Sequence, residues 1–165
     1  MTKKLIIMRG PSGSGKSSLV KELTQEASDN RKTCTVHSTD DFHLELKDGI
    51  FVYVFKPEKL RAFHQANLHH ATTSMEMGLD YVIIDNTNTT WKEIEPYVLV
   101  GIGNGYEIVI KEPNTSWKFD AAECARKNTH GVPVEAVARM LQRWEKTSVI
   151  ESKVKQLESK RGKTS

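Results

Sequence analysis

The sequence is poor in the residues that cross-link a protein or place it in a membrane. Only two of its 165 residues are cysteines, Cys34 and Cys124, which are too few and too far apart for a disulfide framework or a zinc site. We expect both to be small, buried or half-buried hydrophobic residues in a reducing compartment, the cytoplasm or the nucleus. No apolar run approaches the length of a membrane span, so we expect no membrane partner. Residues 1–4 lead directly into an apolar run, so we expect no secretory signal.

The sequence also lacks a strong excess of charge of one sign. Its formal net charge is +3 and its isoelectric point is about 8.8, a mild basic excess that comes largely from residues 153–163. This segment could steer nucleic acid, but a solvated helix end that frays into disorder is the interpretation we favour. The sequence therefore predicts one folded domain over residues 1–147, followed at 148–165 by a basic helix end or a disordered tail.

Apolar and amphipathic segments alternate along the chain. Short apolar runs predict strands, and segments of helical spacing, bounded by residues such as Pro57 and Gly78, predict helices. Residues 50–55 are β-prone but follow Asp48-Gly49, which predicts a short ribbon or an insertion outside the main sheet. The pattern is βαβαβαβαα, which indicates one α/β domain with a parallel sheet. The predicted strands are 5–8, 33–37, 81–84 and 106–110, and the helices after the first are 57–77, 91–102, 117–127 and 133–146.

The most informative feature is the glycine-rich segment that separates the first strand from the first helix. It has the pattern G-x-x-x-x-G-K-S, in the strand–loop–helix context that a phosphate-binding loop requires. Glycines let successive backbone N–H groups point at one spot, and the helix N-terminus adds partial positive charge there. Lys16 is predicted to reach the β- and γ-phosphates of a nucleoside triphosphate, and the Ser17 hydroxyl to ligate Mg²⁺. The predicted nucleotide-binding residues are Gly10, Pro11, Ser12, Gly13, Ser14, Gly15, Lys16, Ser17 and Ser18.

Acidic residues follow two of the predicted strands. Asp85 ends the strand at 81–84 and matches a Walker B aspartate, which holds Mg²⁺ directly or through water. An aspartate that merely caps a turn is the alternative. Because ligands bind at the carboxyl ends of parallel strands, the metal role is the better interpretation.

Asp40 and Asp41 follow the strand at 33–37. In nucleotide kinases of this shape, the loop at that place faces the acceptor side of the γ-phosphate. A carboxylate there can accept the proton of an attacking hydroxyl group, while the other can cap the next helical turn. The residues alone do not decide between the two. His43 is either a phosphate contact or a surface residue.

Basic residues gather between the last two predicted helices. Arg126, Lys127 and His130 are candidates for a lid that stabilises the charge of a phosphoryl group in transfer. Arg139 and Arg143, one helical turn apart, form a second basic edge, for which a plain solvated face is an equal alternative.

With these motifs in place, the chain resembles the polynucleotide kinase branch of the P-loop phosphotransferases, in particular the kinase domains of Nedd-binding-protein type. The resemblance covers residues 3–146 and rests on Gly10–Ser17 and four further segments: 40–42, 83–88, 112–117 and 126–133. It implies an adenylate-kinase-like parallel sheet of about four strands in the order 2-3-1-4, flanked by helices, with a helical lid. It also implies ATP or another nucleoside triphosphate, together with Mg²⁺, as ligands.

The resemblance assigns roles that the residues alone leave open. The bacteriophage 5′-hydroxyl polynucleotide kinase, which belongs to this branch, uses the first aspartate of the pair as its general base, and this resemblance points to Asp40. That enzyme has an arginine for the acceptor phosphate three residues later, where this chain has His43, a weaker and pH-dependent donor. The basic lid is also shorter here, so the residue that stabilises the transition state is Arg126, or Lys127 or His130 in its place.

Three functions fit these predictions. The first is ATP- and Mg²⁺-dependent phosphoryl transfer to the 5′-hydroxyl end of RNA or DNA, with Lys16, Asp40 and Arg126 as catalytic residues. The second keeps the reaction and replaces the polynucleotide with a small molecule or nucleoside. The third is a nucleotide-binding switch or slow ATPase. An oligonucleotide acceptor needs an open basic channel, for which the candidate wall residues are Lys56, Lys59, Arg61 and Lys92.

Overall fold

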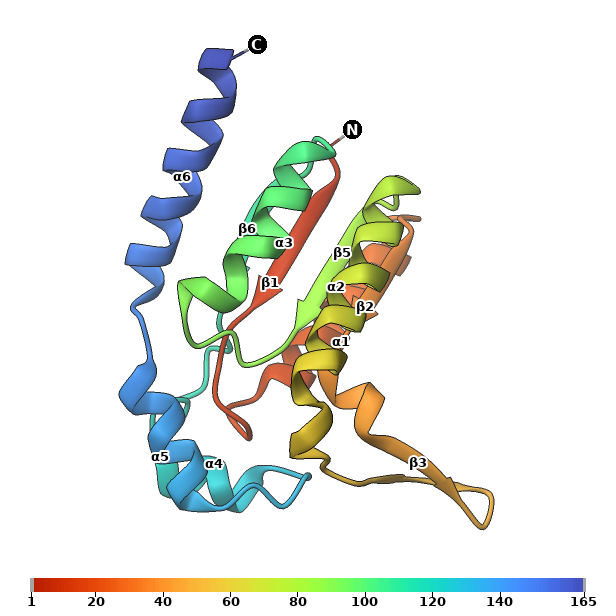
Figure 1. The fold of residues 1–165 in the computed structure, drawn as a ribbon, viewed down its shortest axis with the longest axis vertical. Helices are drawn as coiled ribbons and strands as arrows, with labels where there is room; N and C mark the ends of the chain where they lie inside the picture. Colours follow the sequence, from red (N-terminus) through yellow and green to blue (C-terminus); the bar gives the residue numbers. More distant parts are fainter. Residues whose placement is uncertain (1, 165) are drawn as a thin grey trace.

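The computed structural model describes residues 2–164 and folds them around one parallel sheet (Figure 1). Residues 1 and 165 lie outside the described residues. The sheet contains β1 (Lys4–Met8), β2 (Cys34–His37), β5 (Tyr81–Asp85) and β6 (Glu107–Lys111), in the order β2-β5-β1-β6. All three neighbouring pairs are parallel. Numbered along the chain within this sheet, the strands have the predicted order 2-3-1-4, so the predicted fold class is confirmed.

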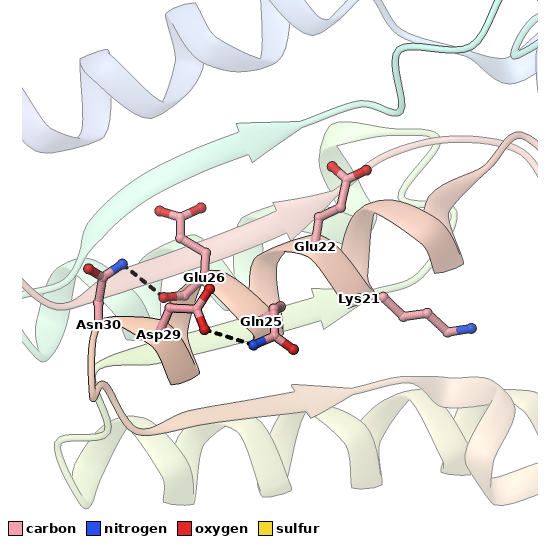
Figure 2. A pocket seen from close by; sticks show the side chains of 6 residues that line it. All are labelled: Lys21, Glu22, Gln25, Glu26, Asp29 and Asn30. Carbon is pink, nitrogen blue, oxygen red and sulfur yellow. Dashed lines mark hydrogen bonds between the residues drawn. The ribbon is translucent and has the colours of Figure 1, made fainter.

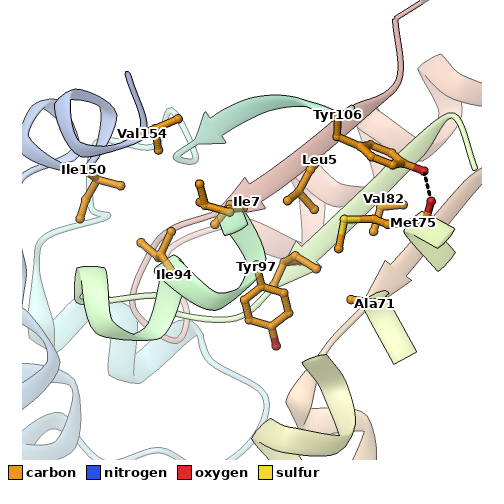
Figure 3. Close-up of a cluster of buried hydrophobic side chains, with 12 residues drawn as sticks. Leu5, Ile7, Ala71, Met75, Val82, Ile94, Tyr97, Tyr106, Ile150 and Val154 are labelled. Atoms are coloured by element: carbon orange, nitrogen blue, oxygen red, sulfur yellow. Dashed lines mark hydrogen bonds between the residues drawn. The ribbon is translucent and has the colours of Figure 1, made fainter. Parts of the chain in front are cut away.

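Helices cover both faces of this sheet. On one face, α1 (Lys16–Asp29) packs Leu23 and Ala27 against Ile6 and Met8 of β1. On the other face, α2 (Leu60–Glu76) and α3 (Trp91–Gly103) pack against the alternate residues of β1 and β5 (Figure 3). Both faces of the strands are therefore buried, which explains why the central strands read as almost pure apolar runs.

The helix predicted at residues 57–77 begins later in the structure than the sequence predicted. Pro57 opens a 3₁₀ turn, η2 (Pro57–Lys59), before α2 begins at Leu60. Gly78, with φ of +77°, follows the helix and ends it as predicted. In the later turns of this helix Ala71 and Met75 are buried, whereas Leu60 in its first turn is exposed.

The two lid helices are shorter than predicted. α4 is Ala121–Lys127, because Asp120 caps it by accepting a hydrogen bond from the backbone N–H of Glu123 at 3.1 Å. α5 is Val134–Arg143, and the chain leaves the helix at Trp144 because the backbone N–H of Glu145 bonds to the carbonyl of Thr89. The predicted ranges 117–127 and 133–146 are therefore corrected at these ends.

The C-terminal segment forms α6 (Thr147–Thr164). Ile150 and Val154 of this helix are buried in the same core cluster as Leu5 and Tyr97, so this part of the helix packs against the domain. The domain boundary at residue 147 stays a prediction. None of the helices within residues 2–164 is long and apolar enough to cross a membrane.

Residues 44–53 form a hairpin outside the main sheet, as predicted for an insertion. Its strands β3 (Leu44–Lys47) and β4 (Ile50–Tyr53) pair antiparallel. Asp48 and Gly49 both have positive φ, of 51° and 78°, the combination that a two-residue type I′ turn requires. Figure 1 shows this hairpin projecting away from the sheet, beyond the end of α2.

Candidate active site

The glycine-rich loop connects the end of β1 to the first turn of α1. Gly13 has φ of +82°, and a Cβ atom at this position would lie 2.0 Å from the carbonyl oxygen of Cys124. Gly15, the N-cap of α1, has φ of +107°, and a Cβ there would lie 2.8 Å from Thr115 Cγ2. These glycines are required because the segment after β6 and the helix α4 press closely on the loop.

Two side chains of the segment after β6 hold the loop from outside. The Thr115 hydroxyl donates to the carbonyl of Ser14 at 2.7 Å, and the Trp117 indole N–H donates to the carbonyl of Gly13 at 3.0 Å. In the part of the chain that the structure describes, Ser14 Oγ is the one buried side-chain oxygen or nitrogen without a hydrogen-bond partner. A buried hydroxyl without a partner calls for an explanation, and a phosphate oxygen bound in the loop is an acceptor that fits it.

Lys16 occupies the first position of α1, where its ammonium group folds back over the loop. Its Nζ donates to the carbonyls of Gly10 at 2.7 Å and Pro11 at 3.1 Å. Burial lowers the pKa of Lys16, and the charges of Asp85 and Asp40 are the largest influences that oppose this shift. Both carboxylates therefore lie within electrostatic reach of a single ammonium group.

The register of the sheet explains why these groups meet. Met8, two residues before the loop, pairs with Asp85 at the end of β5. β2 pairs with the other edge of β5, and the backbone N–H of Thr39 donates to Asn86 Oδ1 at 2.9 Å. The loop, Asp85 and Asp40 thus follow three adjacent parallel strands at one edge of the sheet, where such sheets bind ligands.

Asp85 and Ser17 are the predicted oxygen ligands for a metal ion. Burial raises the pKa of Asp85, the charge of Lys16 opposes this shift, and the charges of Asp40 and Asp41 add to it. Within the described residues, no three histidine, cysteine, aspartate or glutamate side chains are grouped to hold a metal. Mg²⁺ needs no such group when it binds with a nucleotide, because waters and phosphate oxygens supply most of its ligands beside one or two protein oxygens. The residues present fit this ion.

Asp40 lies in the 3₁₀ turn η1 (Thr39–His43), between the hairpin and the lid. Its side chain is 53% exposed, and its Oδ2 lies 3.4 Å from His130 Nδ1. The Tyr53 hydroxyl at the end of β4 also hydrogen-bonds to Asp40, and burial, together with this carboxylate, raises the pKa of Tyr53 to about 12. The rings of Tyr53 and His130 stack at 4.1 Å between centroids. The hairpin, through Tyr53, and the lid, through His130, therefore contact each other next to Asp40.

The structure corrects the prediction for His43. Its side chain is neither a surface residue nor aimed at a phosphate; it is buried, with Nδ1 accepting a hydrogen bond from the backbone N–H of Lys56 at 3.1 Å. Its ring packs against Tyr53, Phe55 and Phe63. His43 is therefore the residue that anchors the base of the hairpin.

Of the predicted lid residues, only His130 is brought to Asp40. Arg126 is exposed on α4 and pairs with Glu123, with Nη2 and Oε2 2.8 Å apart. Lys127 places its ammonium group 4.3 Å from the centre of the Trp117 ring, and so supports the loop indirectly. Asp41 is exposed next to Asp40, and burial and the Asp40 charge raise its pKa.

The predicted wall of a basic channel is only partly available. Lys56 is half-buried and pairs with Glu45 at 2.9 Å. The other candidates lie at the solvent-exposed starts of α2 and α3: Lys59, Arg61 and Lys92.

Sequence reasoning missed Arg9, the residue that ties the loop to its surroundings. This arginine is fully buried, and its guanidinium group lies 4.0 Å from the centre of the Trp144 ring. It donates at 2.7–2.9 Å to the carbonyls of Asn88, Thr89 and Glu145 and to the hydroxyl of Thr147. Its position directly before the loop was the only signal available, because its partners come from distant segments.

A shallow depression follows the outer face of α1 (Figure 2). Its lining residues come from the later turns of the helix and its C-terminal end, and two of them bond to each other: Gln25 Nε2 donates to Asp29 Oδ1 at 2.8 Å. Lys16 lies at the opposite end of this helix, so the depression is not part of the phosphate loop. The lining residues are Lys21, Glu22, Gln25, Glu26, Asp29 and Asn30.

Comparison with known proteins identifies a matching family and a related human protein. A family model described as an AAA domain matches residues 5–147. Human NEDD4-binding protein 2 is 34% identical over 142 residues, which cover 86% of this chain and 8% of that protein. The chain thus spans a small part of the curated relative it matches.

Two solved structures share the fold. A chain of the Pnkp1/Rnl/Hen1 RNA repair complex superposes with a TM-score of 0.64 at 14% identity, covering 92% of this chain and 46% of that one. The APS kinase CysC of Mycobacterium tuberculosis, in complex with AMPPNP and APS, has a TM-score of 0.54 at 15% identity, covering 87% and 78%. The molecule therefore has the fold of the P-loop kinases.

Proposed function

We propose, on the premise that the chain belongs to the AAA-domain family, that it transfers a phosphoryl group from ATP to the 5′-hydroxyl end of RNA or DNA. The observation that carries this proposal is the meeting of three strand ends at one edge of the sheet. The phosphate loop follows β1, Asp85 ends β5, and Asp40 follows β2. Phosphoryl transfer needs this combination: a phosphate cradle, oxygen ligands for Mg²⁺ and a carboxylate on the acceptor side.

Each residue then has a defined role. The loop amides and Lys16 bind the β- and γ-phosphates, and Ser17 and Asp85 would hold Mg²⁺, which neutralises charge on the phosphates when bound. The acceptor hydroxyl oxygen attacks the γ-phosphorus, the bond from phosphorus to the ADP oxygen breaks, and Asp40 takes the hydroxyl proton. The exposure of Asp40 gives an acceptor access to it.

Arg126 is the proposed stabiliser of the transferring group, with Lys127 and His130 as the alternatives. Its pairing with Glu123 does not oppose this role strongly, because an exposed ion pair of this kind contributes at most about 1 kcal/mol. Arg126 can therefore exchange Glu123 for a phosphoryl oxygen at little cost.

The choice of a polynucleotide acceptor is supported by two considerations. Asp40 is 53% exposed and lies in the turn that directly precedes the hairpin, which suits the end of a long molecule. A structurally similar chain comes from the Pnkp1/Rnl/Hen1 RNA repair complex. Both cysteines are free thiols, in keeping with a reducing compartment, the cytoplasm or the nucleus, as the place of action.

The test is transfer of label from γ-labelled ATP to a 5′-hydroxyl oligonucleotide in the presence of Mg²⁺. We expect Asp40→Asn to lower kcat by about 10²–10⁴-fold, the usual contribution of a general base. Asp41→Asn distinguishes the two aspartates, and Asp29→Asn, on the exposed end of α1, is the matched control. Label that reaches only small hydroxyl compounds would indicate a small-molecule kinase. ATP hydrolysis that is insensitive to acceptors and to Asp40→Asn would indicate a nucleotide switch.

A further inference from the structure

The β3–β4 hairpin has two chemically different faces. Because alternate residues of a strand point to opposite sides, and directly paired residues to the same side, the register assigns every side chain to a face. Leu44 pairs with Tyr53 and Leu46 with Phe51. These four residues form what we call the hairpin face.

The opposite side carries the charges. Glu45, Val52, Lys47 and Ile50 make up this side. Glu45 pairs there with Lys56 at 2.9 Å and with Lys47 at 3.9 Å. The hairpin face has no carboxylate between Tyr53 and the turn, so a phosphate backbone that follows it meets no anionic side chain of either strand.

The hairpin face is largely solvent-exposed although it is apolar. Phe51 is 69% exposed and Leu46 is 64% exposed. Ile50 and Val52 are exposed on the opposite side as well, but there they lie beside charged residues. A contiguous exposed apolar stretch without charges, such as Leu44, Leu46 and Phe51 form on the hairpin face, marks a site of interaction. Tyr53, at the inner end of the same face, bonds to Asp40 and stacks on His130, so the face is continuous with the candidate active site.

We propose that the hairpin face binds the bases next to the 5′ end of a single-stranded acceptor, with the ring of Phe51 as a stacking platform. The proposal rests on the function proposed above and names how that site holds its substrate. Phe51 is two residues from Tyr53 along β4, which places it about 7 Å farther from Asp40. At about 3.4 Å per stacked nucleotide, this distance corresponds to two base steps. An acceptor of several nucleotides reaches Phe51, whereas a mononucleotide does not.

Stacking on an aromatic ring suits an enzyme that acts on ends of any sequence, because every base has a π-face. The hairpin is held for this task at its base rather than along its length. The backbone N–H of Val54 donates to the carbonyl of His43 at 2.8 Å, and the His43 ring packs on Tyr53 and Phe55. The hairpin is therefore anchored at its base, and its hairpin face stays exposed to solvent.

The chain supplies a matched pair of variants for the test. Phe51 and Ile50 are neighbours on β4 with nearly equal exposure, 69% and 67%, but they lie on opposite faces. We would measure the fluorescence anisotropy of a 3′-labelled, ten-nucleotide 5′-hydroxyl oligonucleotide with the full chain. Phe51→Ala should weaken its binding about tenfold, within the range for loss of one base–aromatic stack. Ile50→Ala should leave binding unchanged, and Phe51→Trp should restore it.

Kinetics supply the second measurement. Phe51→Ala should raise KM for the oligonucleotide about tenfold while KM for ATP stays unchanged. A nucleoside 3′-monophosphate, too short to reach Phe51, should be phosphorylated equally by both proteins. If the parent protein does not bind the oligonucleotide, or if Phe51→Ala and Ile50→Ala behave alike towards it, the docking proposal is wrong.

The remaining outcomes separate this inference from the proposed function. Oligonucleotide binding that depends on Phe51, without phosphoryl transfer to any 5′-hydroxyl acceptor, upholds the docking face and overturns the kinase assignment. Phosphoryl transfer to the oligonucleotide that Phe51→Ala leaves unchanged upholds the kinase assignment and overturns the docking proposal. A parent dimer that Phe51→Ala dissociates, with oligonucleotide binding unchanged, would make the hairpin face a contact between two copies of the chain and overturn the proposal.

Discussion

The nucleotide side and the acceptor side of the candidate site are built in different ways. Around the phosphate loop, backbone groups are held by buried side chains, above all Arg9 with its four acceptors. Around Asp40, the contacts are a half-exposed histidine ring, a tyrosine hydroxyl and stacked rings supplied by a projecting hairpin and a lid. One side is fixed by the core, and the other by the docking of two peripheral segments.

This difference suits the chemistry proposed for each side. A triphosphate has the same shape in every turnover, so a rigid cradle that needs no rearrangement binds it best. An acceptor end that varies in sequence and length requires a surface that a chain can enter and leave. The contrast predicts that changes on the nucleotide side abolish activity or stability, whereas changes to the residues that surround Asp40 on the acceptor side modulate them.

Apart from the proposed general base Asp40, the largest effect is expected at Lys16. Lys16→Ala removes the ammonium group that faces the phosphates and should lower phosphoryl transfer by about 10³-fold, as the loss of a single charge-stabilising donor does in other enzymes. Because burial disfavours this charge, its removal should not unfold the protein. Steady-state kinetics and a thermal melt test both points, with Lys21→Ala on the exposed face of α1 as control. Near-normal turnover of Lys16→Ala would show that the nucleotide side does not depend on this ammonium group, and the comparison would be wrong.

The next effect is on stability, at Arg9. Arg9→Ala leaves the carbonyls of Asn88, Thr89 and Glu145 without their donor and removes the stacking partner of Trp144. We expect the free energy of unfolding to fall by about 3 kcal/mol, since each buried acceptor left unpaired costs about 1–3 kcal/mol. Urea denaturation measures this change. Arg139→Ala, at an exposed position of α5, should change it by less than about 0.5 kcal/mol.

The contrast also explains what the sequence could predict. The phosphate loop is a local feature, in which eight consecutive residues and their flanking periodicity specify both structure and ligand. Asp85 and Asp40 were identifiable because the carboxyl ends of parallel strands share one edge. The strand order within the sheet was predicted from the resemblance and is confirmed.

The remaining features depend on contacts between residues far apart in the sequence. Arg9 donates hydrogen bonds to residues 79 to 138 positions away, and the sequence around Arg9 does not indicate these partners. His43 reads as a polar residue beside an acidic pair, yet the hairpin folds back and buries it. The early end of α5 has the same origin, because Glu145 bonds to the distant Thr89.

On the acceptor side, we expect a moderate effect from the tyrosine that orients Asp40. Tyr53→Phe keeps the ring stacked on His130 but removes the hydroxyl that bonds to Asp40. Hydrogen bonds to charged groups contribute about 1.5–3 kcal/mol, so kcat should fall about tenfold with KM for ATP unchanged. Val52→Ala, on the opposite face of β4, is the control; an unaltered kcat would remove Tyr53 from this role.

The smallest effect is a pH dependence that arises at the root of the hairpin. Burial lowers the pKa of His43, against the charges of Asp40 and Glu58 and together with those of Lys56 and His64. The unfolded chain therefore binds the proton more readily, so this contribution to stability is complete above about pH 6.5, the ordinary pKa of histidine, and is lost as the pH falls through the folded value. Asn at this position can keep an acceptor for the Lys56 N–H without titrating. The unfolding free energy measured in urea should thus fall more steeply between pH 7.5 and 5.5 in the parent than in His43→Asn. Since His37, whose pKa burial also lowers, is present in both proteins, it cancels in the difference, and equal slopes would show that protonation of His43 does not loosen the hairpin.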